Sequence, residues 1–188
     1  MKTRCTWPGA NPLMIAYHDE EWGVPLRDDS KWFEFLVLDA FQAGLSWQTV
    51  LNKRENFRAA FDQFDYTVIA NYSDEKLDVL GNDTGIIRNK LKIKATKTNA
   101  QAFMEIQHEF GSFDAYIWKF TDGKTIDNGR KTMDEITVNS PESDAMTKDL
   151  KKRGFKFVGS TICYAFMQAA GMVNDHVTEC FRYKEIKG

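Results

Sequence analysis

LKKRGFKFVGST, residues 150–161, has the pattern of a helix that ends, a tight turn that contains glycine, and a second helix that begins at once. The two glycines are Gly154 and Gly159, and glycine is the residue that most readily ends a helix or lets a backbone turn sharply. This order of features is typical of a helix-hairpin-helix motif. We expect the motif to extend over about residues 143–171.

A helix-hairpin-helix of this kind suits the sugar-phosphate backbone of DNA. Gly159 lets the chain approach a phosphate closely, and the next helix, beginning at Ser160 and Thr161, offers unpaired N–H groups and a partial positive charge. The cations near this turn are Lys151, Lys152, Arg153 and Lys156. An ordinary connection between two helices with a solvated basic face explains the pattern at least as well.

The rest of the chain also favours helices. Apolar residues recur at helical spacing, as they do within residues 47–64, and no sustained alternation of apolar and polar residues predicts a strand. Helix starts are expected at Ser30, Ser46, Ser73 and Ser140, and helix ends at Gly81, Gly111, Gly154 and Gly171. These signals predict an all-α fold.

Length and charge limit what this protein can be. With 188 residues, 43% of them hydrophobic, the chain can form one good core or two small helical lobes that share a cleft, and residues 1–188 are expected to be a single unit. The net charge of −2 gives no global positive field, so nucleic-acid binding must use local patches.

No apolar stretch follows the N-terminal Lys2 and Arg4, so we expect no signal peptide and a cytoplasmic protein. The longest apolar run, Ile162–Val173, is too short to span a membrane and predicts a core helix.

Two pairs of metal-binding residues stand at opposite ends of the sequence. Cys5 and His18 lie near the N-terminus, whereas His176 and Cys180 have an i, i+4 spacing that would place them on one face of a helical turn. Two thiolates and two imidazoles form the closed tetrahedral set of one structural zinc ion, which would join the two ends of the chain. An idle terminal thiol and a hydrogen-bonding histidine explain the same residues. The third cysteine, Cys163, is expected to be buried and inert.

Aromatic residues gather in the first quarter of the chain. Of the five Trp and six Tyr, Trp7, Tyr17 and Trp22 flank the first pair of metal-binding residues. This stretch has too many polar residues and prolines for a simple amphipathic helix, which favours an aromatic-lined cleft. Stacked rings attract a flat cationic ligand, because their negative faces need no full countercharge. A place in the hydrophobic core explains most of these rings equally well.

A carboxylate interrupts an otherwise apolar helix. Asp39 lies within the expected helix Trp32–Gln42, a little over one turn before a tight corner at Gly44 and Leu45 that leads into Trp47. From the residues alone, a solvent-facing or salt-bridged aspartate explains Asp39 as well as a functional one does.

Seven short blocks of sequence become specific when they are taken together. They are CTW (5–7), YHDEEWG (17–23), QAGLSW (42–47), KRENF (53–57), GIIR (85–88), RGFKFVG (153–159) and VNDH (173–176). In this order they resemble the 3-methyladenine DNA glycosylase I family, and the resemblance runs essentially from end to end. The agreement of several blocks is far more specific than any one of them.

The resemblance implies a fold, a reaction and a cofactor. The fold would be that of the helix-hairpin-helix DNA glycosylases, with a zinc clasp made by Cys5, His18, His176 and Cys180. The partner would be double-stranded DNA that contains alkylated adenine. The reaction would be hydrolysis of the N-glycosidic bond of 3-methyladenine in base excision repair, by a monomer and without strand cleavage.

The resemblance also implies roles for single residues. The flipped 3-methyladenine would be recognised between Trp47 and Tyr17, with Trp7 and Trp22 lining the pocket and Asp39 as the catalytic residue. Gly44 and Leu45 would fill the gap left in the duplex, while the hairpin from Gly154 to Thr161, including Lys156, Gly159 and Ser160, would hold the phosphate backbone.

Two positions depart from the family pattern. Asp39 stands where a glutamate commonly contacts the methylated adenine, and Met14 stands where an aromatic residue often lies. The shorter carboxylate would fall about one methylene short of the base, a gap that a bridging water can span.

Two other functions fit parts of the sequence. One is a non-catalytic helical DNA-binding module held together by zinc, but backbone binding alone needs no aromatic base pocket. The other is a metallohydrolase, which requires an open coordination position on its metal and is disfavoured by four protein ligands.

Overall fold

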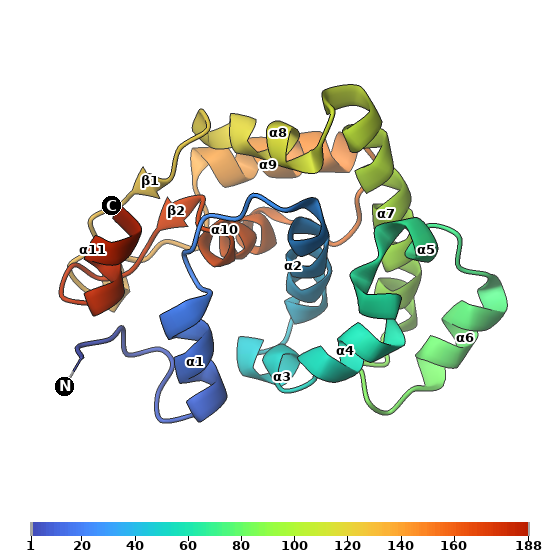
Figure 1. Ribbon diagram of the computed structural model, residues 1–188, viewed down its shortest axis with the longest axis horizontal. Coiled ribbons are helices and arrows are strands. Elements are labelled where there is room, and N and C mark those ends of the chain that lie inside the picture. The colour runs from blue at the N-terminus through green and yellow to red at the C-terminus, as the bar shows by residue number, and fades with distance from the viewer. Residues whose placement is uncertain (1, 188) are drawn as a thin grey trace.

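The computed structural model describes residues 2–187 and has the predicted all-α fold (Figure 1). In the first half of the chain the helices are α1 (Pro12–Glu20), α2 (Asp29–Gln42), α3 (Trp47–Leu51), α4 (Arg54–Ala60), η1 (Asp62–Phe64), α5 (Tyr66–Ile69) and α6 (Asp74–Asn82). In the second half the elements are α7 (Lys90–Phe110), α8 (Phe113–Ile117), η2 (Trp118–Thr121), β1 (Ile126–Asp127), η3 (Met133–Glu135), α9 (Pro141–Lys152), α10 (Ser160–Ala169), β2 (Val173–Asn174) and α11 (Phe181–Lys187).

Most helices begin where the sequence predicts. The side chains of Ser46, Ser73 and Ser140 each accept a hydrogen bond from a backbone N–H in the first turn of α3, α6 and α9. The expected start at Ser30 is wrong, because α2 begins one residue earlier, at Asp29. Its cap is Asp28, whose carboxylate accepts the N–H of Lys31 at 3.0 Å.

Helix α2 forms the centre of the core. It packs against α7 on one side and α10 on the other, and Trp32, Phe33 and Phe41 are almost completely buried (Figure 1). The indole N–H of Trp32 donates to Asp114 at 2.9 Å, so its polar atom is paired within the core. Because α2 is buried along nearly its whole length, any polar side chain on it must face another element or a cavity.

Helices α9 and α10 form the predicted hairpin. They pack closely against each other, and the turn between them covers residues 153–159. Gly154 has φ of +94°, a conformation that glycine adopts without strain. The apolar run Ile162–Val173 supplies most of α10 and the first residue of β2, so its prediction as a core helix is confirmed over the helical part.

The two ends of the chain lie close together, at the left of Figure 1. Strands β1 and β2 pair in parallel, and the N–H of Phe181 donates to the carbonyl of Thr3 at 2.9 Å. Gly171 allows the turn after α10 to touch the segment after α1, since a Cβ there would lie 2.4 Å from the backbone of Pro25.

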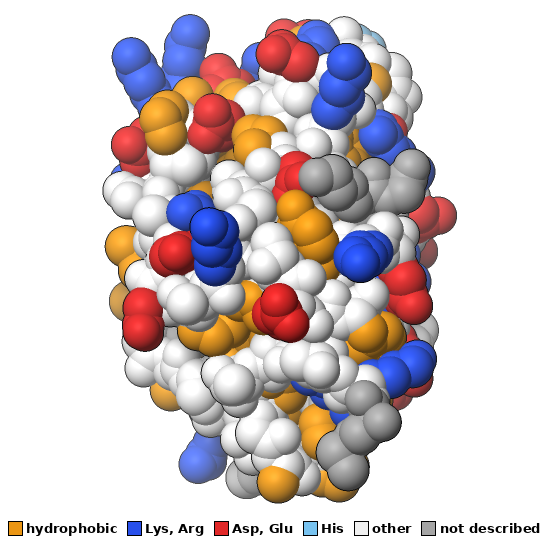
Figure 2. Space-filling model, turned by 90° about the vertical axis from the view of Figure 1, so that its left-hand side faces the viewer, with side chains coloured by type: hydrophobic (Ala, Val, Ile, Leu, Met, Phe, Trp, Pro, Cys, Tyr) orange, Lys and Arg blue, Asp and Glu red, His pale blue; other side chains and the backbone are white. Residues whose placement is uncertain are grey.

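Figure 2 shows basic and acidic side chains interspersed on the face that carries this end of the molecule. No described helix combines the length and the apolar character needed to cross a membrane.

Candidate active site and metal centre

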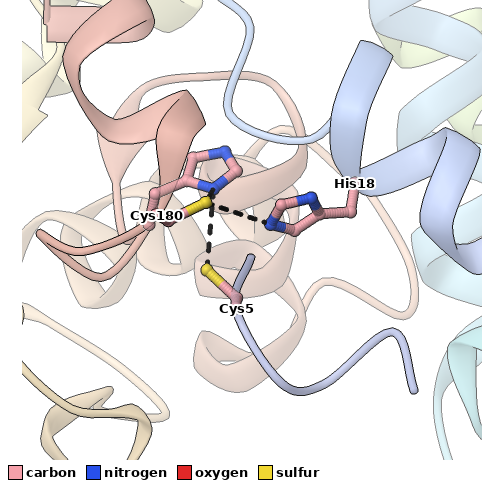
Figure 3. Close-up of side chains that lie close together, drawn as sticks. Cys5, His18 and Cys180 are labelled. Atoms are coloured by element: carbon pink, nitrogen blue, oxygen red, sulfur yellow. Dashed lines mark hydrogen bonds between the residues drawn. The ribbon is translucent and has the colours of Figure 1, made fainter. Parts of the chain in front are cut away.

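The four residues predicted to bind metal come together in a buried cluster. Cys5, His18, His176 and Cys180 are each at most 4% exposed, and their ligand atoms all lie within 4.8 Å of one another. Figure 3 shows the side chains of Cys5, His18 and Cys180 pointing toward a common centre. The Sγ atom of Cys180 lies 3.6 Å from His18 Nε2 and 3.5 Å from His176 Nδ1.

The cluster fits a tetrahedral zinc ion. Zn–S bonds of about 2.3 Å and Zn–N bonds of about 2.0 Å put neighbouring ligand atoms about 3.3–3.8 Å apart. Three of the sulfur–nitrogen distances here are 3.5–3.7 Å. A hydrogen bond from the Cys5 thiol, with further ones from His176 and His18, lowers the pKa of the Cys180 thiol to about 2. This sulfur is therefore held as the thiolate that metal ions bind.

Each imidazole is oriented by a second hydrogen bond outside the cluster. His18 Nδ1 lies 2.8 Å from Asp19, whose carboxylate is held in turn by Arg4 at 2.7 Å. His176 Nε2 lies 3.0 Å from the backbone carbonyl of Trp22. Such outer partners fix the ring nitrogen that faces the metal. His18 thus presents Nε2, and His176 presents Nδ1.

The local structure around the C-terminal ligands differs from the prediction. His176 and Cys180 do not lie on a helical turn, because Cys180 directly precedes α11 and His176 lies in the loop after β2. The side chain of Asn174 accepts the N–H of His176 at 3.3 Å, which gives that N–H a partner outside any helix. A tight turn, with the Cys180 N–H on the carbonyl of Val177 at 2.7 Å, brings the two ligands together instead.

The predicted aromatic cleft is a pocket of about 240 Å³ next to the metal cluster. Its walls include Trp7, Tyr17, Trp22 and Trp47, contributed by α1, α3 and the loops before and after α1. Pockets for drug-sized ligands measure about 300–1,000 Å³, so this smaller pocket suits a single heterocycle. The four aromatic residues that the sequence singled out therefore line one pocket.

Asp39 lines the same pocket and is buried to 2% exposure. Among the described residues, none donates a hydrogen bond to its Oδ2 atom. Burial raises the pKa of Asp39 well above its usual 3.8. The interpretation of Asp39 as a solvent-facing or salt-bridged residue is thus wrong, and its carboxyl group is available to a ligand.

The rings of Tyr17 and Trp47 touch each other. Their centroids are 5.0 Å apart and their planes are inclined by 44°. A ring inserted between two others needs about 7 Å between the outer pair, twice the contact distance of about 3.5 Å between carbon atoms. A base can lie between these rings only after one of them moves. Tyr17 is 3% exposed, whereas Trp47 is half-buried and is the first residue of the short α3.

Further pocket residues were not identified from the sequence. They are Gln42, Met133, Ile136, Ala165, Gln168 and Ala169. Gln42 follows Asp39 by three residues, and Ala165, Gln168 and Ala169 share one face of α10, so helical spacing could have indicated them. Met133 and Ile136 come from the irregular segment before α9, where the sequence gives no such signal.

The corner and the hairpin lie apart from the pocket walls. Gly44 has φ of +81° between α2 and α3, and the Leu45 side chain that follows is 42% exposed. At the hairpin, Gly159 precedes the first turn of α10, which contains Ser160 and Thr161 and has no side-chain cap. The start of α10 therefore presents backbone N–H groups without a capping side chain.

Two residues singled out from the sequence, Arg153 and Met14, have surroundings that the sequence did not indicate. Arg153 is bound by Glu109 at 2.6 Å and Asp149 at 2.8 Å, so its charge is already paired, whereas the Lys156 side chain is exposed. Met14, which departs from the family pattern, is buried outside the pocket.

Known proteins resemble this chain over nearly its whole length. The methyladenine glycosylase family matches residues 7–183. DNA-3-methyladenine glycosylase 1 of Escherichia coli (strain K12) is 49% identical over 180 residues, which are 96% of each chain. A crystal structure of a 3-methyladenine DNA glycosylase I is 52% identical, with a TM-score of 0.93, and the match covers 95% of this chain and 98% of that one.

A second solved structure adds a ligand. It is a variant of a 3-methyladenine DNA glycosylase I in complex with 3-methyladenine, 31% identical, with a TM-score of 0.92 and coverage of 95% of this chain and 96% of that one. The sequence blocks and the fold agree with this relationship. From the match over residues 7–183 and the identity to these relatives, this chain belongs to the methyladenine glycosylase family.

Proposed function

We propose that this protein is a DNA-3-methyladenine glycosylase that hydrolyses the N-glycosidic bond of 3-methyladenine in alkylated double-stranded DNA. The observation that carries the proposal is the aromatic pocket with a buried carboxyl group, Asp39, on its wall. Two named relatives support it: the Escherichia coli glycosylase by its activity, and the solved complex by its ligand.

The pocket would select the lesion by its charge. Methylation at N3 makes the adenine a cation and weakens its bond to C1′, so the enzyme need not supply a strong acid. Tyr17, Trp7, Trp22 and Trp47 offer electron-rich ring faces that attract a cation more than a neutral base. Extrusion of a base costs a few kcal/mol, and a damaged base costs least. Attraction and easier flipping therefore act on the same base.

Asp39 would complete the recognition. Its unpartnered oxygen is the acceptor that a protonated or amino-bearing edge of the base requires. When the cationic base binds, its positive charge stabilises the ionised carboxylate and lowers the pKa that burial has raised. Burial thus favours the neutral carboxyl group of Asp39 in the free protein, and the cationic base favours its anion in the complex.

The Tyr17–Trp47 contact predicts a movement on binding. We propose that Trp47 swings away from Tyr17 and that the base then stacks between the two rings. Trp47 is the mobile partner because it is half-buried on a helix of five residues, whereas Tyr17 is held within α1. The contact of the two rings fills the space in the absence of base.

The DNA would be held at the corner and at the hairpin. Leu45, exposed beyond Gly44, is placed to fill the gap that the flipped base leaves in the duplex. The backbone N–H groups of Gly159, Ser160 and Thr161, with the exposed side chain of Lys156 in the turn after Gly154, would bind phosphates.

The reaction would be simple hydrolysis. Water attacks C1′, the bond to N9 breaks, the electron pair neutralises the positive charge on the departing base, and the proton that the water loses passes to solvent. None of the residues that line the pocket is a lysine, so no Schiff base to the sugar is expected and the DNA strand stays intact.

We propose one structural zinc ion on Cys5, His18, His176 and Cys180. Four buried protein ligands support a closed site, in which the metal stabilises the fold and takes no part in the reaction. The ion would fix the orientation of both histidines, and through them the loops that carry Trp7 and Trp22.

The test is release of free 3-methyladenine from alkylated duplex DNA. We expect wild-type protein to release the base without nicking the strand, and Trp47→Ala to lower kcat/KM by about 5- to 150-fold, since base stacking on an aromatic side chain is worth about 1–3 kcal/mol. Phe110→Ala, which removes a half-buried ring outside the pocket, is the matched control. Equal losses in the two variants, or no base release by the wild type, would contradict the proposal.

A further inference from the structure

Helix α7 holds the end of α2 through a buried lysine. The Nζ atom of Lys92 donates to the backbone carbonyls of Phe41 at 2.9 Å and Ala43 at 2.6 Å, and the residue is 6% exposed. Carbonyls at the end of a helix lack helical partners and attract a cation. The next residues, Gly44 and Leu45, form the exposed corner. Lys92 therefore fixes two of the three carbonyls that directly precede this corner.

The same helix holds the turn of the hairpin. Asn99 accepts the N–H of Lys156 at 2.8 Å and donates to the carbonyl of Lys156 at 3.1 Å. Asn99 is 1% exposed, so this pair of hydrogen bonds is shielded from water. The next residue, Phe157, has φ of +58°, which a residue with a side chain adopts only when its surroundings impose it. Its ring lies 5.8 Å from Lys92 Nζ.

These two attachments lie on one face of α7. Lys92 and Asn99 are seven residues apart, which is about two helical turns and about 10 Å along the axis. α7 spans 21 residues and is the longest helix of the described chain, so the spacing between its two attachments is rigid. Through it, the corner after α2 and the turn between α9 and α10 are fixed relative to each other.

We propose that Lys92 and Asn99 are positioning residues, which set the distance between the Leu45 corner and the hairpin so that Leu45 enters the gap when the hairpin holds the phosphates. The inference rests on the proposed glycosylase function. Neither residue touches the base. Lys92 acts through backbone carbonyls and not through a phosphate, because its ammonium group is buried against Phe41 and Ala43.

The first experiment compares Lys92→Met with Lys94→Met. Methionine keeps the length of the aliphatic stem and removes the ammonium group, and Lys94 is an exposed lysine on the same helix, so both variants lose one positive charge. Single-turnover excision of 3-methyladenine from duplex DNA is measured per active site, with active sites counted by titration with free 3-methyladenine. We expect Lys92→Met to be slowed by about 10-fold or more, because a hydrogen bond from a charged group stabilises by at least that factor. Lys94→Met should match the wild type.

A second measurement reports whether the Leu45 side chain fills the gap in the duplex. 2-Aminopurine is placed opposite an abasic analogue in a duplex, where its fluorescence changes when a side chain fills the gap. Leu45→Ala gives the reference fluorescence of a gap that no side chain fills. We expect Lys92→Met to approach that signal while its affinity for free 3-methyladenine stays at the wild-type value. A loss of folded protein alone would change the number of active sites and leave the signal per site unaltered.

The shared spacing predicts a coupling between the two residues. Asn99→Ala should slow excision as well, since it frees the backbone of Lys156. Sites about 10 Å apart usually show independent effects. If α7 sets one distance, the double variant should be little slower than the slower single variant, because the spacing is already lost.

The outcomes separate this inference from the proposed function. If wild-type protein released no 3-methyladenine, the proposed function would fail and the inference with it. If the wild type were active but Lys92→Met equalled Lys94→Met, or the double variant lost the full product of the single losses, only the positioning role would be overturned. A salt dependence of binding reduced by about one unit in Lys92→Met would identify a phosphate contact and also overturn it.

Discussion

Replacing Asp39 by asparagine should raise stability and lower selectivity at the same time. Asp39 is 2% exposed, its Oδ2 atom has no donor among the described residues, and burial raises its pKa well above 3.8. Asparagine fills nearly the same volume and carries no charge at any pH. Asp39→Asn therefore removes a titration while it keeps the shape of the pocket wall.

The effect on stability follows from proton uptake. Where the pH lies between 3.8 and the raised pKa, the unfolded chain ionises Asp39 whereas the folded chain keeps the proton, so folding takes up a proton from solution. Over this range each pH unit lowers the free energy of unfolding by about 1.4 kcal/mol, and the loss is complete above the raised pKa. This contribution favours the fold at low pH and is lost as pH rises from 3.8 toward the raised pKa. We expect Asp39→Asn to be more stable than wild type by about 1–3 kcal/mol at pH 7, after the cost of its own buried amide. The difference should shrink as pH falls toward 3.8.

The effect on selectivity follows from the charge of the substrate. In the proposed complex the ionised carboxylate of Asp39 would face a cationic base, and a hydrogen bond to a charged group is worth about 1.5–3 kcal/mol. The ratio of 3-methyladenine release to adenine release should thus fall by about 10- to 150-fold in Asp39→Asn. Asp39→Glu, which keeps the carboxylate and is one methylene longer, should retain the ratio.

Two assays test the expected changes in stability and in selectivity of Asp39→Asn. Denaturant unfolding at pH 7 and at pH 4 measures the stability difference, and base release from alkylated and from undamaged duplex measures selectivity. A variant that is less stable than wild type at pH 7 would refute the reasoning about burial. Unchanged discrimination between the two bases would refute the role in recognition.

Two further predictions concern the fold around the pocket. Removal of the metal by a strong chelator should lower Tm by about 10 °C and weaken binding of 3-methyladenine, because a structural metal contributes directly to folding free energy. Zinc should restore both, and a chelated protein with the Tm and affinity of the untreated one would contradict the clasp. Glu34→Gln should destabilise the fold by about 3–5 kcal/mol in denaturant unfolding, because Glu34 accepts hydrogen bonds from Arg54 at 2.8 Å and Arg58 at 2.6 Å in a buried network. Burial alone would raise the pKa of Glu34, but the charge of Arg54 and then that of Arg58 outweigh it and lower the pKa. The contribution of Glu34 to stability is therefore full above pH 4.5 and is lost as pH falls through the lowered pKa; a Glu34→Gln variant that keeps this decline would exclude Glu34 as its source.

The sequence predicted features that depend on local chemistry. Glycines at 154 and 159 mark the hairpin whatever surrounds it, and Ser140 followed by Pro141 marks the start of α9, because capping needs only neighbouring residues. The four metal ligands could be grouped from far apart because thiol and imidazole pairs are scarce in a chain with three cysteines and three histidines.

Features that depend on a distant partner were not predictable in the same way. The basic run around Lys92 contains nothing that distinguishes it from Lys90 and Lys94, and only the packing of α7 on the end of α2 buries one of the three. Met133 and Ile136 reach the pocket because the loop before α9 folds over it. In each case the deciding partner lies many residues away, and its position is a result of the tertiary fold.

The two sides of the pocket differ in rigidity, and the metal cluster explains why. On one side, Trp22 lies 4.6 Å from the ring of His176 and its carbonyl is bound to His176 Nε2, while Trp7 lies 5.5 Å from His18. Rings packed on the two histidines of the Cys5, His18, His176 and Cys180 cluster cannot shift without disturbing the cluster that joins the chain ends. On the other side, Trp47 begins a helix of five residues and touches only one pocket ring, Tyr17, among the ring contacts of the described residues. A base that enters the pocket must therefore contact the fixed wall at Trp7 and Trp22 and displace Trp47. The shape of the fixed wall can thus exclude a base that does not fit before Trp47 packs against it.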